Sequence, residues 1–394
     1  MPDPDTTPPT RRLRDALTEF LGTEAAGGAV LLVAAVAALV VANSPLSDTY
    51  VDVLHHTLGF EVGAFELRED VLHWVNDGLM ALFFFVVGLE IKRELVVGEL
   101  RGIRRAALPA IAALGGMVVP AGIYALWNLG GDGGRGWGIP MATDIAFALG
   151  VLALFASRLP SSLRVFLLSL AIVDDLGAIA VIAVFYTETI EMGWLAGAIA
   201  MIGVVLAMRA AGVSAISAYV VPGVALWVCT LESGVHATIA GVALGVLTPV
   251  HPVRGRSVGE LLEHRLHPWT SFVVVPLFAL SNAGVVLDRD ILADAASSRV
   301  TWGIVTGLVA GKVIGILAGV AVGRRMGLGH FPPEVRAHHL VGVALVAGIG
   351  FTVSLFVADL AFVDAGLLAD AKLGVLGASA LAGVLGALTL MSRR

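Results

Sequence analysis

Charged residues are scarce in this sequence of 394 residues: 14% are Asp, Glu, Lys or Arg, whereas soluble domains contain about a quarter. By contrast, 57% of the residues are hydrophobic, and the mean hydropathy is +0.89. A chain with so little charge cannot cover itself with a polar surface in water. It also has no dense run of Lys and Arg, so we expect no nucleic-acid binding.

Cysteine is almost absent, since Cys229 is the only one. An internal disulfide and a site built from several thiolates are therefore excluded. The sequence also lacks a Gly-x-x-x-x-Gly-Lys-Ser/Thr phosphate-binding loop, so ATP is not the expected source of energy. We expect no bound cofactor. We also expect no cleavable signal peptide, because the first apolar run is long enough to remain in the membrane.

Long apolar runs are what the sequence has in abundance. A bilayer-spanning helix needs about 20 mostly apolar residues, and roughly twelve segments approach that length. Nine are clear, at 26–43, 76–95, 106–127, 163–187, 193–210, 213–230, 270–287, 301–322 and 373–391. Three are interrupted by Gly, Pro or charge, at 138–157, 234–250 and 339–363. The sequence therefore predicts an all-α polytopic membrane protein with the lipid bilayer as its surroundings.

The basic residues predict the orientation of these spans. Most of the 25 lysines and arginines fall in segments on the same side as the N-terminus, which the positive-inside rule assigns to the cytoplasm. This distribution favours an even number of spans with both termini cytoplasmic. We expect a cytoplasmic N-terminal tail at 1–20 and one transmembrane domain at 21–394.

One external segment has a different sequence pattern from the other loops. In residues 59–67, Gly63 and Ala64 stand between two short alternating stretches, as in a small β-hairpin. An irregular loop is the alternative interpretation of the same pattern.

Asp174 and Asp175 lie in the middle of the apolar run 163–187. An ionisable residue there costs at least about 2.5–3.5 kcal/mol, so such residues usually face a bundle interior or a water-filled cavity. Neighbours on a helix point about 100° apart, since a turn holds 3.6 residues. One carboxylate could therefore bind a cation while the other meets a buried partner. A capping pair at a loop is the alternative.

Lys312 is equally far from either end of the run 301–322. A buried lysine must find a carboxylate or lose its proton. The pairing could serve transport, or it could be a fixed structural ion pair.

Two segments combine polar residues with helix-breaking residues. Thr143 and Asp144 follow Pro140 inside an apolar segment, and glycines interrupt residues 347–352. Paired interrupted helices indicate a transporter site at the bilayer midplane. We expect Asp144 to neutralise helix N-termini there and Lys312 to neutralise C-termini, because the end dipoles need opposite charge.

Several charged residues lie at the ends of spans, where two interpretations remain open. Asp77 and Glu90 flank the run 76–95, and Glu90 begins a charged exit that includes Lys92, Arg93 and Glu94. A solvated helix end is the preferred interpretation for Lys92 and Arg93, and a functional site is the alternative. The cluster of Glu263, His264 and His267, like the separate His236, could sense pH or could simply be an interfacial anchor.

Taken in order along the chain, these segments closely resemble the bacterial NhaA-type sodium/proton antiporters. The matching stretches are 76–84, 88–94, 139–149, 171–178, 233–238, 266–269, 276–284, 311–312 and 348–352. They extend over nearly the whole chain, and together they are highly specific.

The resemblance implies twelve spans, two of them discontinuous, with an inverted repeat relating the third to fifth helices to the tenth to twelfth. It implies an electrogenic exchange in a bacterial inner membrane, in which protons enter and Na⁺ or Li⁺ leaves. It also implies a homodimer formed through the hairpin at 59–67.

The resemblance also implies roles for individual residues. Asp175 would bind the ion, and Asp174 would pair with Lys312. Thr143 and Asp144 would lie where the broken helices cross, and Asp77 would be structural. A pH response would involve Glu90, Arg93, Glu94, His236, Glu263 and His264.

Two other function classes were weighed against this one. A cation channel, or a related transporter with another cation selectivity, would also need buried carboxylates. A membrane protease built on Asp144 and Asp175 would need a Gly-rich motif that the sequence lacks. We therefore expect a transporter and no enzymatic activity.

Overall fold

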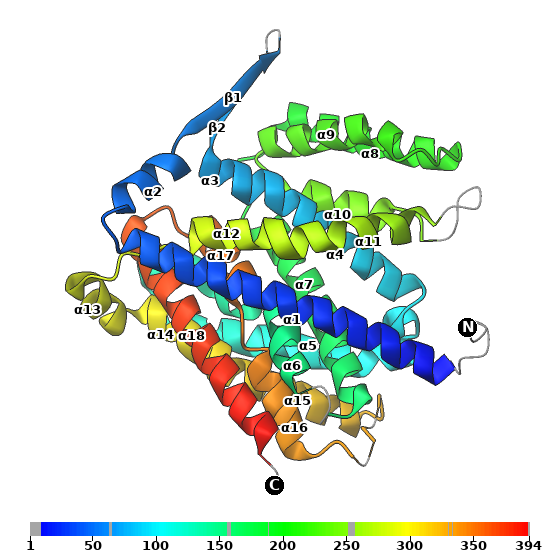
Figure 1. Cartoon of the computed structure of the whole chain (residues 1–394), viewed down its shortest axis with the longest axis vertical. Helices are drawn as coiled ribbons and strands as arrows, with labels where there is room; N and C mark the ends of the chain where they lie inside the picture. Colours follow the sequence, from blue (N-terminus) through cyan, green and yellow to red (C-terminus); the bar gives the residue numbers. More distant parts are fainter. Residues whose placement is uncertain are drawn as a thin grey trace, which may run out of the picture.

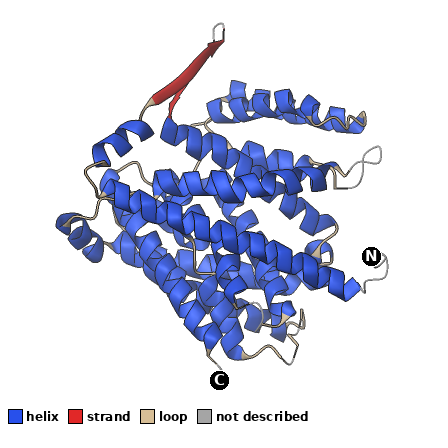
Figure 2. Ribbon diagram, in the orientation of Figure 1, coloured by secondary structure: helices blue, strands red, loops and turns tan. Residues whose placement is uncertain are grey.

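The computed structural model describes residues 9–62, 65–155, 159–187, 189–250, 257–329, 331–332 and 334–392. Most of them are helical, and Figure 2 shows one pair of strands projecting from the helices. The first third of the chain forms α1 (Pro9–Ala42), α2 (Ser47–Leu54), β1 (Thr57–Val62), β2 (Phe65–Asp70), α3 (Val71–His73), η2 (Trp74–Leu79), α4 (Met80–Val96), η3 (Glu99–Arg101) and α5 (Ile103–Trp127).

The middle and last parts of the chain continue the helical pattern. The middle holds η4 (Asp132–Met141), α6 (Ile145–Leu154), α7 (Ser161–Phe185), α8 (Met192–Ala210), α9 (Ser217–Glu232), α10 (Thr238–Leu247), α11 (Val258–Trp269), η5 (Thr270–Val274) and α12 (Val275–Asn282). The last part holds α13 (Arg289–Ser297), α14 (Arg299–Thr306), η6 (Gly307–Gly311), α15 (Lys312–Arg325), α16 (Ala337–Val346), α17 (Phe351–Ala361) and α18 (Ala365–Met391).

The helices have the length and composition of a membrane protein that crosses the bilayer several times. Within the described residues, six are long and apolar enough to span a membrane, and two bent pairs raise that number to eight. Two other predicted spans correspond to helices joined to π-helical segments, as η2 joins α4 and as η5 joins α11 to α12. The remaining two correspond to the shorter apolar helices α9 and α10. The prediction of a polytopic all-α protein is confirmed.

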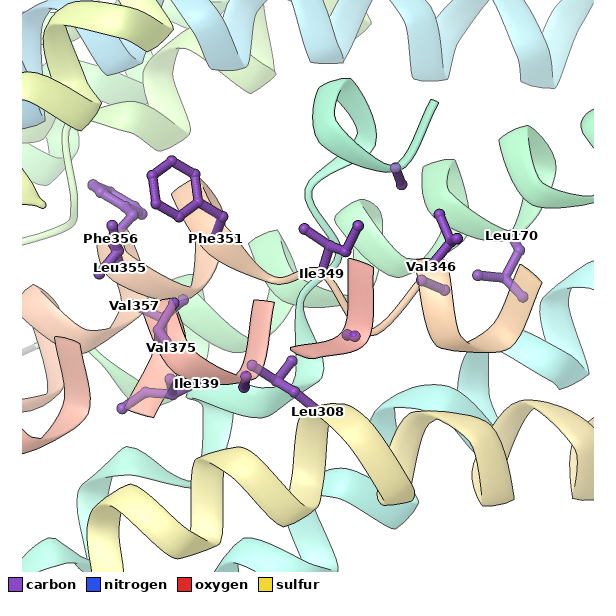
Figure 3. Packing of buried hydrophobic residues seen from close by; sticks show 14 of the residues in the cluster. Ile139, Leu170, Leu308, Val346, Ile349, Phe351, Leu355, Phe356, Val357 and Val375 are labelled. Carbon is purple, nitrogen blue, oxygen red and sulfur yellow. The ribbon is translucent and has the colours of Figure 1, made fainter. Parts of the chain in front are cut away.

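Two predicted helix breaks are confirmed. The helices η4 and α6 meet at 44° across a short break, and α16 and α17 meet at 45° across another. Both breaks lie within the packed interior, and α17 packs on η4. Figure 3 shows part of the surrounding apolar core, with Leu308 from η6, Val346 from α16 and Phe351 from α17.

The remaining helices surround this crossing. The helix α5 packs along α15 on one side and contacts α7, while α4 packs along α10 and α1 packs along α6 and α12. In Figure 1, α8 and α9 lie side by side at the edge of the molecule. The predicted boundary at residue 20 falls within α1, which already begins at Pro9.

The hairpin predicted at 59–67 is confirmed, and an irregular loop is the wrong interpretation. β1 and β2 pair antiparallel, with Thr57 opposite Asp70 and Val62 opposite Phe65. The two residues between the strands, 63–64, lie outside the described residues. The hairpin projects from the same end of the molecule as α2 and α13, whereas α1 begins at the opposite end (Figure 1).

Candidate functional site

Asp174 and Asp175 lie in the middle of α7 and are both buried, with 0% and 4% of their surface exposed. The interpretation of a capping pair at a loop is therefore wrong. Because adjacent residues diverge on a helix, the two carboxylates meet different surroundings. Asp174 faces a buried ammonium group, whereas Asp175 lines a cavity.

Lys312 is the buried partner of Asp174. Its side chain is fully buried, and Nζ lies 2.6 Å from Asp174 Oδ2 and 3.0 Å from Thr143 Oγ1. Nζ also donates a hydrogen bond to the carbonyl oxygen of Met141, the last residue of η4. One carbonyl oxygen, one hydroxyl oxygen and one carboxylate thus surround the ammonium group. They replace the water that the charge loses on burial.

The two helix breaks are hydrogen-bonded to each other. Thr143 Oγ1 donates to the carbonyl of Ala347 at 2.7 Å, and Asp144 N donates to the carbonyl of Ile349 at 2.7 Å. These bonds satisfy backbone groups that the interruptions would otherwise leave unpaired in an apolar interior.

The Asp144 carboxylate caps both helices that begin at the crossing. Oδ1 accepts from Phe147 N at 3.0 Å, at the start of α6. Oδ2 accepts from Thr352 N at 3.0 Å and from Thr352 Oγ1 at 2.6 Å, at the start of α17. A helix N-terminus carries a partial positive charge, so one carboxylate compensates two of them. The ammonium group of Lys312 lies at the C-terminal end of η4, where a helix carries a partial negative charge.

Asp175 lines a cavity of about 50 Å³ between α4, α6, α7, α17 and the run from α11 to α12. Its Oδ1 is buried and has no hydrogen-bond partner among the described residues. The polar groups that share the cavity are Glu90, Asp144, His267, Thr270, Ser271 and Thr352. Carboxylate and hydroxyl oxygens are the ligands that hard cations prefer, so this chamber suits a small cation.

Four of the six predicted pH-responsive residues form one cluster. Arg93 pairs with Glu263 on α11 and lies 3.7 Å from Glu94 on its own helix. Glu90 Oε1 lies 3.6 Å from His267 Nδ1. Since Glu90 and His267 also line the cavity, the cluster adjoins the chamber that holds Asp175.

The other predicted residues lie apart from this cluster. His264 is exposed on α11. His236 Nε2 lies 2.8 Å from the carbonyl oxygen of Tyr186, beyond the end of α7. The carbonyl of Asp77 accepts a 2.9 Å hydrogen bond from the indole of Trp227. None of these three lines the cavity of Asp175.

The predicted roles left out four polar members of the cavity: His267, which the sequence marks only as part of a cluster that could sense pH or anchor a helix, and Thr270, Ser271 and Thr352. His267, Thr270 and Ser271 follow Glu263 by four, seven and eight residues. Steps of that size return to the same side of a helix, so the three share a face with Glu263. That spacing was the available signal. Thr352 follows a predicted helix break, but no charge marks it.

Comparison with known proteins adds to this geometry. A family model described as Na+/H+ antiporter 1 matches residues 18–390. The chain is 48% identical over 387 residues to the Na(+)/H(+) antiporter NhaA of Bordetella parapertussis, which covers 96% of this chain and 97% of the relative. It is 47% identical over 380 residues to the Na(+)/H(+) antiporter NhaA of Yersinia enterocolitica, covering 95% and 96% of the two chains. The resemblance seen in the motifs is confirmed, and the chain belongs to the Na+/H+ antiporter 1 family.

Proposed function

We propose that this protein exchanges Na⁺ or Li⁺ for protons and uses the proton gradient to extrude the cation. The observation that carries the proposal is the Asp175 carboxylate, buried in a small polar cavity with one oxygen unpartnered. The names of the relatives, all Na(+)/H(+) antiporters, support Na⁺ and H⁺ as the exchanged ions.

The exchange is a competition for the two aspartates. A buried carboxylate is unstable as a bare anion, so Asp175 holds either a proton or a cation at any time. Loading one species releases the other. Asp174 takes part when its ion pair with Lys312 breaks. The carboxylate of Asp174 cannot bind a proton and remain ion-paired with the ammonium group at the same time. Two carboxylates accept more positive charge as protons than one monovalent cation supplies, so the exchange is electrogenic.

The crossing of the broken helices positions these groups. Thr143 and Asp144 join the two breaks, and Lys312 contacts both Thr143 and Asp174. A shift of either broken helix would therefore move the carboxylates and the ammonium group together. This coupling is what alternating exposure of one site to two sides of a membrane requires.

We assign the pH response of exchange to Glu90, Arg93, Glu94, Glu263 and His264, with His236 as a separate contributor. Support comes from the ion pairs that link α4 to α11 next to the cavity. Changes of protonation there would alter how these helices pack beside Asp175.

The assembly proposed with this function has twelve spans in a bacterial inner membrane, with both termini in the cytoplasm. The paired breaks support an inverted repeat of the third to fifth and tenth to twelfth spans. The projecting hairpin supports a homodimer formed through residues 59–67, since its edges are available for pairing with a second copy.

The test is cation-induced loss of a pH gradient in everted membrane vesicles from a host without its own antiporters. Na⁺, Li⁺ and K⁺ are added in turn between about pH 6.5 and 8.5, where histidine clusters titrate. We expect responses to Na⁺ and Li⁺ that rise with pH. The variant Asp175→Asn, nearly equal in shape, should insert normally and give no response. Exchange by that variant at the normal rate would refute the assignment of Asp175.

A further inference from the structure

The wall of the cavity formed by α11, η5 and α12 carries two hydroxyl groups. Thr270 and Ser271 both line the chamber that holds Asp175, and only 3% and 9% of their surfaces are exposed. The lining of the cavity around them includes Phe83 and Val87 from α4 and Val275 from α12, which are apolar. Two adjacent hydroxyl groups in such a wall need a reason, because burying a hydroxyl without full hydrogen bonding is unfavourable.

The local backbone explains how adjacent residues reach one cavity. Thr270 is the first residue of the π-helical segment Thr270–Val274, which lies between two stretches of α-helix. A π-helix closes its hydrogen bonds over five residues, so successive side chains diverge less than in an α-helix. Short π-helical segments of this kind occur often at functional sites.

The hydrogen bonding of the two hydroxyl groups leaves their oxygens available. Thr270 Oγ1 donates its proton to the carbonyl oxygen of His267 at 2.9 Å, so the oxygen presents only lone pairs to any further partner. The Ser271 hydroxyl has no hydrogen-bond partner within the part of the chain that the structure describes. The same cavity holds the unpartnered Oδ1 of Asp175.

The size of the cavity suits a cation that has lost part of its water shell. A water molecule needs roughly 10–15 Å³ of such space, and the cavity offers about 50 Å³. A cation entering it keeps only a few waters and must replace the others with protein oxygens, as ions do in selectivity filters. Carboxylate oxygen comes from Asp175, and neutral oxygen comes from Thr352 and the two hydroxyl groups of η5.

We propose that Thr270 and Ser271 form a hydroxyl subsite that replaces water around the cation bound at Asp175, and so sets its affinity and selectivity. The inference rests on the proposed cation exchange and extends it to a second wall of the site. The two hydroxyl groups hold no proton in the exchange. They position and select the cation.

The test compares variants that remove a hydroxyl group but keep the shape of the side chain. These are Thr270→Val, Ser271→Ala and the double variant, with Thr270→Ser as the conservative replacement. Thr230→Val is a matched control, since Thr230 is also buried and its Oγ1 also bonds a backbone carbonyl, that of Leu226 at 2.8 Å. Ser281→Ala is the control for Ser271→Ala in the same helical run and outside the cavity.

The readouts are the apparent KM values for Na⁺ and Li⁺ in proteoliposomes and direct titration of Na⁺ into purified protein. Loss of binding oxygens should raise KM for Na⁺ about five- to tenfold in the double variant and leave the maximal rate within about twofold. The Na⁺/Li⁺ ratio of KM values should change as well. Thr270→Ser should stay close to wild type, as should both controls.

Values of KM and of Na⁺ affinity in the double variant equal to those of Thr230→Val would overturn the proposal. Failure of Thr270→Ser to retain affinity would do the same, because it would attribute the effect to packing. The proposed function has a separate test in Asp175→Asn. If that variant loses exchange while the hydroxyl variants match wild type, only the subsite is refuted. If wild type shows no exchange, the Na⁺ titration still decides whether the hydroxyl groups bind the cation.

Discussion

Lys312 reaches Asp174 from a helix 138 residues further along the chain, and both side chains are fully buried. Neither charge would be stable there alone, because each loses its water shell on burial. Their 2.6 Å contact, with Thr143 and Met141 supplying further oxygens, makes the pair tolerable. Each charge therefore depends on the other to remain buried, and the pair gives little net stability by itself.

This dependence predicts how variants of the pair behave. Lys312→Met should lower the free energy of unfolding by about 3–5 kcal/mol, because it leaves Asp174 as an unpaired buried charge. Adding Asp174→Asn should restore much of that loss, since the second change removes the stranded charge. Chemical unfolding of the detergent-solubilised proteins measures both values. A double variant as unstable as Lys312→Met alone would contradict the idea of mutual compensation.

The same residue scale separates what the sequence predicts from what it leaves hidden. Asp174, Asp175 and Lys312 stand out because a charge inside an apolar run is costly and therefore rare. Thr270 and Ser271 lack that signal, since hydroxyl groups are common in membrane helices, where they bond the preceding turn. Only the packing of α11 and η5 against α4, across the cavity from Asp175 on α7, shows that they share a chamber with it.

At the scale of elements, α5 and α15 approach each other closely through glycine. A Cβ atom at Gly115 would collide with the carbonyl oxygen of Gly315, and one at Gly315 would collide with that of Gly115. Further along α5, a Cβ atom at Gly122 would meet nothing within 4 Å. Since α15 begins with Lys312, the spacing of these helices places the ammonium group next to α7.

The comparison of these glycines gives a second prediction. Gly115→Ala should destabilise the protein by about 1–3 kcal/mol, because backbone cannot move aside as a flexible side chain can. Gly122→Ala, in the same helix, should be neutral or stabilising by about 0.5–1 kcal/mol, since alanine favours the helix. Thermal unfolding in one detergent measures the difference. Equal effects of the two substitutions would show that α5 and α15 are not held at this distance by Gly115.

The junction between the hairpin and α3 depends on Asp70. Its carboxylate accepts a 2.8 Å hydrogen bond from His73 N and lies 2.9 Å from His55 Nδ1 and 2.7 Å from His73 Nδ1. Burial raises the pKa of Asp70, but the bonds from His73 and His55 outweigh burial and lower it overall. Burial likewise lowers the pKa of His73, but the bond to Asp70 and nearby carboxylates outweigh it and raise the pKa overall.

These shifts predict that the junction is tightest in mildly acid solution. A raised histidine pKa stabilises the fold below the unfolded value of about 6.5, and the contribution disappears as pH rises through the folded value. The lowered pKa of Asp70 contributes above about pH 3.9 and is lost only in stronger acid. The protection factors of the β2 amides, which are exchange rates corrected for the intrinsic base catalysis of amide exchange, should therefore fall as the pH rises through the raised pKa of His73.

Asp70→Asn is the control for this pH dependence. Without the carboxylate the pKa of His73 should fall toward its ordinary value, and the protection factors in β2 should be low and nearly independent of pH. Protection factors of the wild-type hairpin that stay constant as the pH rises would contradict the role of His73.

Elements also differ in how far the sequence predicts them. The hairpin follows from local alternation around Gly63 and Ala64, and both helix breaks follow from proline, glycine and polar residues within apolar runs. The π-helical segments η2, η5 and η6 have no comparable local signal. Each contains an extra residue in a helical turn, which becomes favourable only when tertiary packing uses the displaced side chains.

At the scale of the whole molecule, the distribution of basic residues and the arrangement of the helices agree. Lysines and arginines concentrate in segments predicted to be cytoplasmic, and the hairpin and α13 lie at one end of the helices, away from the start of α1 (Figure 1). A basic segment resists transfer across the membrane, so this asymmetry predicts the orientation of the whole bundle. The orientation in turn decides which side of the membrane the cavity of Asp175 faces.

The single native cysteine makes this orientation directly testable. In a Cys229→Ala background, Ser297→Cys on α13 and Ser392→Cys after α18 each give one exposed thiol. In intact cells, a membrane-impermeant thiol reagent should label the cysteine at position 297 and spare the one at position 392. Everted vesicles should reverse the result, because they turn the cytoplasmic face outward. Labelling of both positions from the same side would mean that the three segments predicted to span the membrane between them, at 301–322, 339–363 and 373–391, do not make an odd number of crossings. That result would contradict the predicted set of spans and the cytoplasmic C-terminus.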